Sequence, residues 1–221
     1  RLSVEQAVDY HFAGISMLLE ARAQIEKVGL KVPEILLETI EQAILTGAYL
    51  LYSDGSAPAI GDTYYDGSWR YFIGRYYELL GKENQQLSNF MKIGQRALRD
   101  YYLIAEEGLF INKNHTEDSL DKYFFEFGKN RIVHGHFDNL NVLAELDSNK
   151  LLIDSGGPYT YSYEGRTNFW AKSAQNNLLI NNKNLNDGES RLNYLSESEN
   201  ITAIQAEQLS GSVSHSRTIV Y

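Results

Sequence analysis

The chain has 221 residues and a formal charge of −9, with 20 Lys and Arg against 29 Asp and Glu. This balance excludes a general nucleic-acid binder, which would carry a basic surface. Hydrophobic residues make up 43% of the chain, so a packed core is expected. Cysteine is absent, which excludes disulfides and thiolate metal sites. No apolar run approaches the roughly 18 residues that a membrane span needs.

The first hundred residues carry apolar side chains at helical spacing. Helices are predicted over residues 3–28, 33–51, 67–80 and 84–99. Gly29 is expected to end the first helix, and residues 53–58 have the composition of a turn. Helical hairpins in succession predict an all-α module.

From about residue 100 the pattern changes to short strands separated by Gly, Asn and Ser. Strands are predicted over residues 101–105, 109–111, 123–127, 140–146, 150–154, 177–180, 201–208 and 213–221. The strands on either side of Asp147-Ser148-Asn149 are expected to form a hairpin. Strands and helices do not alternate, so the sheet is predicted to be antiparallel and the fold class α+β.

Candidate chemistry is concentrated in the segment Arg131–Asn139, which contains two of the five histidines. On a regular strand His134 and His136 would point to the same face, whereas a bend at Gly135 would turn them apart. With Asp138 nearby, these residue types fit either a metal site or a general acid–base site. A purely structural role for the histidines is the alternative.

Two other positions are ambiguous from the residues alone. Asp154 follows an apolar strand and fits a turn-initiating role, yet the predicted hairpin would also bring it near His136 as a His–Asp metal pair. Tyr10 and His11 lie within the first predicted helix, where the residues alone favour a position on the helix surface or in the packing over a functional role.

Several motifs in order resemble the heparinase II/III-like polysaccharide lyases. The matching stretches are Glu5–His11, Asp54–Asp62, His134–Asn139, Leu151–Gly156, Tyr161–Asn177 and His215–Arg217. The resemblance implies the C-terminal part of an (α/α) toroid over residues 1–105, followed by an antiparallel β-sandwich over residues 106–221. The earlier part of the toroid would then precede Arg1.

The resemblance also implies cleavage of a uronate-containing acidic polysaccharide by β-elimination. Neutralising the uronate carboxylate stabilises the enolate-like intermediate, a base removes the C5 proton, and an acid protonates the leaving oxygen. By resemblance Tyr10 is the acid and also a candidate base, and His134 is the base or the carboxylate neutraliser. Tyr161 is a second phenol at the cleaved bond, with Tyr163 as its competing assignment.

The positions implied to bind substrate are His11, Arg131, Asn139 and Arg166. Either arginine could bind the substrate carboxylate as a two-pronged donor. No nucleic acid and no membrane are expected as partners, and the oligomeric state is left open. Because such polymers lie outside the cytoplasm, a periplasmic or secreted location is expected.

Some members of the family hold a structural zinc, although the reaction requires no cofactor. The matching ligand positions here are His136 and Asp154, and the third position is Gln175, a poor zinc ligand. His215, from a later strand, is an alternative third ligand. Two other functions use the same scaffold: a non-catalytic glycan-binding or envelope-polysaccharide assembly protein, and a uronate C5-epimerase.

Overall fold

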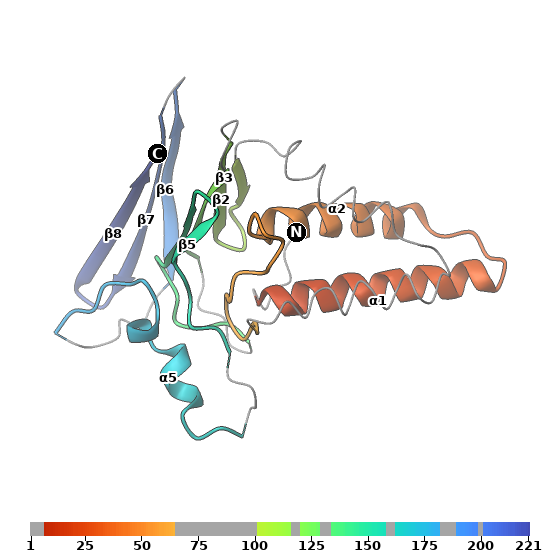
Figure 1. The fold of residues 1–221 in the computed structure, drawn as a ribbon, viewed down its shortest axis with the longest axis horizontal. Coiled ribbons are helices and arrows are strands. Elements are labelled where there is room, and N and C mark those ends of the chain that lie inside the picture. Colours follow the sequence, from red (N-terminus) through yellow and green to blue (C-terminus); the bar gives the residue numbers. More distant parts are fainter. Residues whose placement is uncertain are drawn as a thin grey trace.

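The computed structural model describes residues 7–64, 101–115, 120–128, 134–157, 162–181, 189–198 and 201–221. Two helices come first, α1 (Val8–Lys27) and α2 (Glu34–Leu50), and the short α5 (Arg166–Trp170) and the 3-10 helix η1 (Lys172–Ala174) follow much later (Figure 1). The predicted helices over residues 67–80 and 84–99 lie outside the described residues.

Two antiparallel sheets account for the described strands. The first has the order β1 (Tyr101–Ile104), β2 (Leu109–His115), β3 (Leu120–Glu126), β4 (Val142–Leu146) and β5 (Asn149–Leu152). The second has the order β6 (Ser190–Glu197), β7 (Thr202–Ser210) and β8 (Val213–Val220). The mixed helical and antiparallel fold predicted from the sequence is therefore confirmed.

The helical pair α1–α2 forms because each helix has one apolar face. In α1 this face is made by Val8, Phe12, Ile15 and Leu19, all buried, at the spacing of a helix that packs on one side. The chain leaves α1 through Gly29, whose positive φ of 74° most other residues avoid. The predicted end of the first helix is thus confirmed.

The five-stranded sheet lies between the helical pair and the three-stranded sheet (Figure 1). Successive residues of a strand point to opposite faces, and the core follows this alternation. Ile111 and Phe124 pack in the cluster that contains the helices, whereas their neighbours Phe110 and Phe125 pack with Ile204 of β7. Both faces of the sheet are therefore buried at β2 and β3, whereas the edge strand β5 is largely exposed.

The hairpin predicted after the histidine segment is confirmed as β4–β5. Leu146 pairs with Asn149, and the two residues between them, Asp147 and Ser148, both have positive φ, as a two-residue hairpin turn requires. The predicted strand over residues 177–180 is wrong, since only Ile180 forms a bridge there.

Strand β6, helix α5 and the short 3-10 helix η1 were not predicted from the sequence. Strand β6 was missed because a bulge between Leu192 and Tyr194 interrupts the alternation of polar and apolar residues. Helix α5 has only five residues, too few for a helical period to be recognised.

Candidate active site

Tyr10 and His134, which are far apart in the sequence, lie in direct contact. Their rings stack with centroids 3.8 Å apart and planes inclined by 17°. Tyr10 is in the first turn of α1, and His134 is in the loop that precedes β4. Both residues are half-buried, so each combines a supported ring with access to solvent.

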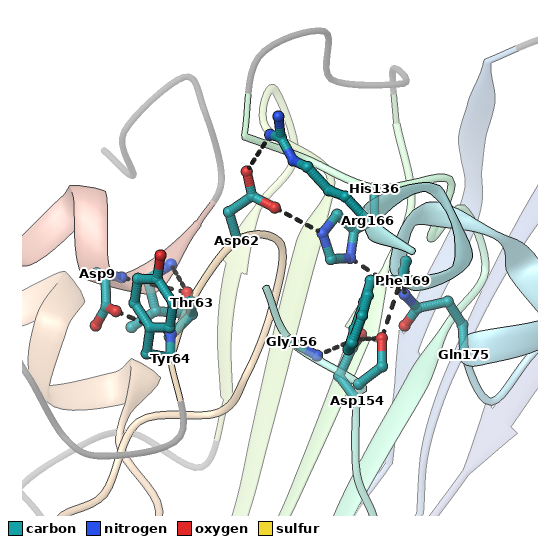
Figure 2. A network of polar contacts seen from close by, with 12 residues as sticks. Asp9, Asp62, Thr63, Tyr64, His136, Asp154, Gly156, Arg166, Phe169 and Gln175 are labelled. Atoms are coloured by element: carbon teal, nitrogen blue, oxygen red, sulfur yellow. Dashed lines mark hydrogen bonds and ion pairs between the residues drawn. The ribbon is translucent and has the colours of Figure 1, made fainter. Parts of the chain in front are cut away.

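Tyr10 is positioned by a helix cap that comes from a distant segment. The backbone N–H groups of Val8 and Asp9 donate to the Thr63 hydroxyl, at 2.7 and 3.3 Å. The N–H of Tyr64 in turn donates to the Asp9 carboxylate at 2.9 Å (Figure 2). Because the first N–H groups of a helix have no partner within it, these contacts fix where α1 begins. The predicted start at residue 3 is wrong, since Ala7 is extended.

His134 is positioned by the same distant segment, residues 61–64, which we call the 61–64 turn. The N–H of Asp62 donates to the His134 carbonyl oxygen at 2.8 Å. Gly61 has a φ of +60°, and a Cβ at this position would lie 2.6 Å from that oxygen. Only glycine permits this approach, so the turn brings the beginning of α1 and the His134 loop together.

The Asp62 carboxylate is the centre of a buried network (Figure 2). One oxygen lies 3.1 Å from Nε2 of His136, and the other accepts from Nη2 of Arg166 at 2.9 Å. Burial opposes ionisation, but these two partners outweigh it and hold the pKa of the Asp62 carboxyl below its usual value. The Arg166 guanidinium also lies over the Trp170 ring, 4.5 Å from its centroid.

His136 and Asp154 share a buried cluster, but their hydrogen bonds go to other residues. His136 contacts Asp62 through Nε2 and the Gln175 amide through Nδ1, at 3.3 Å. Asp154 instead accepts from Asn141 at 2.8 Å and from the N–H of Gly156 at 3.2 Å. Burial raises the pKa of the Asp154 carboxyl to about 7, against the influence of His136.

This cluster does not fit the zinc site that the motifs suggest. Both ring nitrogens of His136 already have hydrogen-bond partners, and the third position is the Gln175 amide. His215 lies on β8 opposite Gln208 of β7, so its backbone belongs to the second sheet. Within the described part of the chain, no group of three or more His, Asp or Glu side chains could hold a metal ion. No catalytic step is therefore assigned to zinc.

Two predicted substrate-binding residues are buried. His11 donates from Nε2 to the Ala43 carbonyl of α2, and burial lowers its pKa to about 4. Asn139 accepts from the hydroxyl of Ser190, while its carbonyl accepts from Lys172. Both placements favour structural roles, and their contact with substrate stays a prediction.

Of the remaining predicted site residues, some lie within the described part of the chain and others do not. Arg131 and Tyr161 lie outside the described residues. Tyr163, the competing assignment for the second phenol, is 54% exposed and packs against the edge of Phe169. Arg166 is joined to the Tyr10–His134 region through the 61–64 turn, as described above.

Sequence reasoning missed Asp62 and Tyr64 as members of the site. Burial raises the pKa of Tyr64, and the groups that influence it electrostatically include Tyr10, Asp62 and Arg166. Tyr64 therefore lies within electrostatic range of Tyr10 and Arg166. The signal that could have found Asp62 is the stretch Asp54–Asp62, which was used only as part of the family resemblance.

The helical pair followed by two antiparallel sheets is the fold of a segment of known polysaccharide lyases. No protein-family model and no curated protein matches the chain. Among solved structures, heparinase III (the BT4657 gene product) superposes with a TM-score of 0.82 and 24% identity over 99% of this chain. Heparan sulfate lyase HepC from Pedobacter heparinus has a TM-score of 0.80 and 18% identity over 98% of it.

The resemblance predicted from the motifs is thus confirmed as a likeness of fold. The alignments cover 36% of each of those two chains, so this chain spans about a third of the length of the structures it matches. In the described part of the chain, no helix has the length and apolar character needed to cross a membrane.

Proposed function

We propose that the protein is a polysaccharide lyase that cleaves a uronate-containing acidic polysaccharide by β-elimination. The observation that carries this proposal is the Tyr10–His134 stack at 3.8 Å. The motifs assign chemistry to these two residues, and they meet in a fold shared with two lyases. The fold alone would not support a function, because folds host many activities.

In the proposed reaction His134 removes the C5 proton and Tyr10 protonates the leaving oxygen. The electrons of the C5–H bond form the C4–C5 double bond as the C4–O bond breaks, and the Tyr10 hydroxyl supplies the proton that the oxygen gains. Arg166 neutralises the uronate carboxylate, whose negative charge grows in the transition state. Tyr161 remains the proposed second phenol.

The side-by-side rings also favour one stereochemistry. An acid and a base in contact act on the same face of a sugar ring, so the C5 proton and the C4 oxygen should leave from one face. Glucuronate and mannuronate have this arrangement, whereas their C5 epimers, iduronate and guluronate, do not. Glucuronate- or mannuronate-rich polymers are therefore the preferred substrates in this proposal.

The larger architecture is proposed with the same support. The α1–α2 pair would be the last part of an (α/α) toroid, and the two sheets, which pack through one apolar cluster, would be layers of a β-sandwich. A periplasmic or secreted location follows from a polymeric substrate found outside the cytoplasm.

The test is product formation on a panel of polymers: heparan sulfate, polymannuronate and polyguluronate. The expected product carries a C4–C5 double bond, which absorbs in the ultraviolet. Tyr10→Phe should reduce the rate at least ~100-fold while leaving the circular dichroism spectrum unchanged, because it removes only the acidic hydroxyl. Tyr194→Phe, on the exposed surface of β6, is the matched control and should retain full activity.

Three results would contradict the proposal. Deuterium incorporation at C5 without chain cleavage would identify an epimerase. Oligosaccharide binding without turnover would identify a glycan-binding protein. Full activity in Tyr10→Phe would show that another group donates the proton.

A further inference from the structure

The Asp62 side chain joins two segments that are separate in the sequence. Its carboxylate is 2% exposed and contacts His136, in the loop before β4, and Arg166, at the beginning of α5. The Arg166 contact is an ion pair at 2.9 Å between side chains that are 104 residues apart. A carboxylate in this position can fix the direction of a guanidinium.

Arg166 depends on contacts from outside its own helix because α5 is too short to fix a side chain by itself. The helix has five residues, no side-chain cap and no buried residue. Isolated helices of this length do not persist, so the helix alone cannot hold a side chain in place. The Trp170 ring supports one face of the guanidinium, and Asp62 fixes its rotation within that plane.

The backbone and the side chain of Asp62 perform separable tasks. The N–H donates to the His134 carbonyl, and this bond does not involve the carboxylate. A change from Asp to Asn would therefore keep the contact that places His134, while weakening the ion pair with Arg166. This separation makes the side chain testable without dismantling the 61–64 turn.

We propose that Asp62 is a positioning residue that acts through Arg166, aiming its guanidinium at the carboxylate of the uronate substrate. The inference rests on the proposed lyase function for its catalytic consequence. Asp62 touches neither the substrate nor the reacting bond. Its contribution is geometric, since displacing a charge-neutralising group by about 1 Å costs up to ~100-fold in rate.

A double-mutant cycle tests this route of action. Asp62→Asn should lower kcat/KM by about 10- to 100-fold, mainly through kcat, because the neutralised charge is largest in the transition state. In an Arg166→Gln background the same change should have less than about a threefold effect, since the group being aimed is gone. If the fold-losses of the two single variants multiply in the double variant, Asp62 acts by a route other than Arg166, and the proposal is overturned.

Asp54→Asn is the matched control. Asp54 also makes an ion pair, with Lys150 at 2.8 Å, in the turn that precedes the site; this pair is more exposed and involves none of the site residues. The same chemical change at Asp54 should leave kcat/KM within about twofold of the unmodified protein. A loss equal to that of Asp62→Asn would mean that weakened packing explains both.

A readout without turnover separates failure of this inference from failure of the lyase proposal. The side-chain Nε–H resonance of Arg166, assigned by its loss in Arg166→Gln, should be sharp in the unmodified full chain and broadened in Asp62→Asn. If no polymer is cleaved but the resonance broadens, the lyase proposal fails and the positioning by Asp62 stands. An unchanged Arg166 resonance overturns the inference, whatever the activity.

Discussion

At the scale of single residues, neighbouring positions of α1 have opposite surroundings. Tyr10 reaches the His134 ring at the surface, whereas His11 is 4% exposed and pairs with the Ala43 carbonyl of α2. Burial disfavours the charged imidazolium and lowers the His11 pKa to about 4. His11 should therefore make the helical pair sensitive to acid.

The sign of this effect follows from the two pKa values. Below pH 6.5, the ordinary pKa of histidine, His11 is protonated in the unfolded chain. In the folded chain it stays neutral until the pH falls to about 4. Neutral His11 therefore contributes fully to the free energy of unfolding above pH 6.5. Acidification to pH 4 lowers this free energy by about 3 kcal/mol. His11→Gln, which keeps a donor for Ala43, should lack this loss. Urea unfolding of both proteins at neutral and acidic pH measures it, and parallel pH curves would contradict the assignment.

The sequence identified the two residues in contact but not what holds them. The roles of Tyr10 and His134 were predicted from the family resemblance, because from the residues alone Tyr10 fitted a packing position. His136 and Asp154 share a buried cluster, as the hairpin predicted, but the hydrogen bonds of His136 go to other residues. The hydrogen-bond partner is Asp62, 74 residues earlier, and only the close approach at Gly61 reveals it.

At the scale of elements, buried charge joins the end of α2 to the first sheet. Strand register places Lys122 of β3 opposite Glu145 of β4, and both are buried. The Lys122 ammonium donates to the carbonyl oxygens of Tyr49 and Leu51, at the end of α2, where unpaired carbonyls attract a positive charge. Burial lowers the Lys122 pKa to about 7, against the attraction of Glu145.

Lys122→Met should lower the free energy of unfolding by about 3–5 kcal/mol. The substitution keeps the volume of the side chain but leaves the Glu145 charge and two helix-end carbonyls without their cation. Lys150→Met is the control, because Lys150 makes a partly exposed ion pair with Asp54 that should be worth at most about 1 kcal/mol. Urea denaturation measures both, and equal effects would show that Lys122 is no more than a surface charge.

Elements defined by local pattern were predictable, and those defined by distant partners were not. The two helices and the β4–β5 hairpin follow from apolar spacing and turn residues. The beginning of α1 does not, because its cap is the Thr63 hydroxyl, 55 residues away from Val8. The same holds for α5, a helix without a buried residue of its own.

At the scale of the whole molecule, apolar clusters cross the boundaries expected from the sequence. One cluster contains residues of α1 and α2 together with Ile104, Ile111, Phe124 and Leu143 of the first four strands. The helical pair and the first sheet thus share a core across the boundary predicted at residue 105. The division into domains over residues 1–105 and 106–221 stays a prediction.

Lys172 links the second sheet to the loop that carries the site. It is fully buried, and its ammonium donates to the Asn139 carbonyl at 3.0 Å and to the side chain of Gln208 on β7 at 2.7 Å. Asn139 follows His134 by five residues and also accepts from Ser190 of β6. The three-stranded sheet can therefore stabilise the loop that contains His134.

Lys172→Met should consequently loosen a specific part of the molecule. Removing the ammonium takes a buried donor away from the Gln208 side chain and from the Asn139 carbonyl, which also accepts from Asn177, so the free energy of unfolding should fall by about 1–3 kcal/mol. Amide hydrogen exchange should rise in residues 134–141 and in β6–β7, where the lost partners lie, and less in α1 and α2, which pack on the opposite face of the first sheet. Exchange that rises equally in all elements would mean that Lys172 supports global packing only. Exchange that rises only in the second sheet would mean that the loop containing His134 does not depend on Lys172.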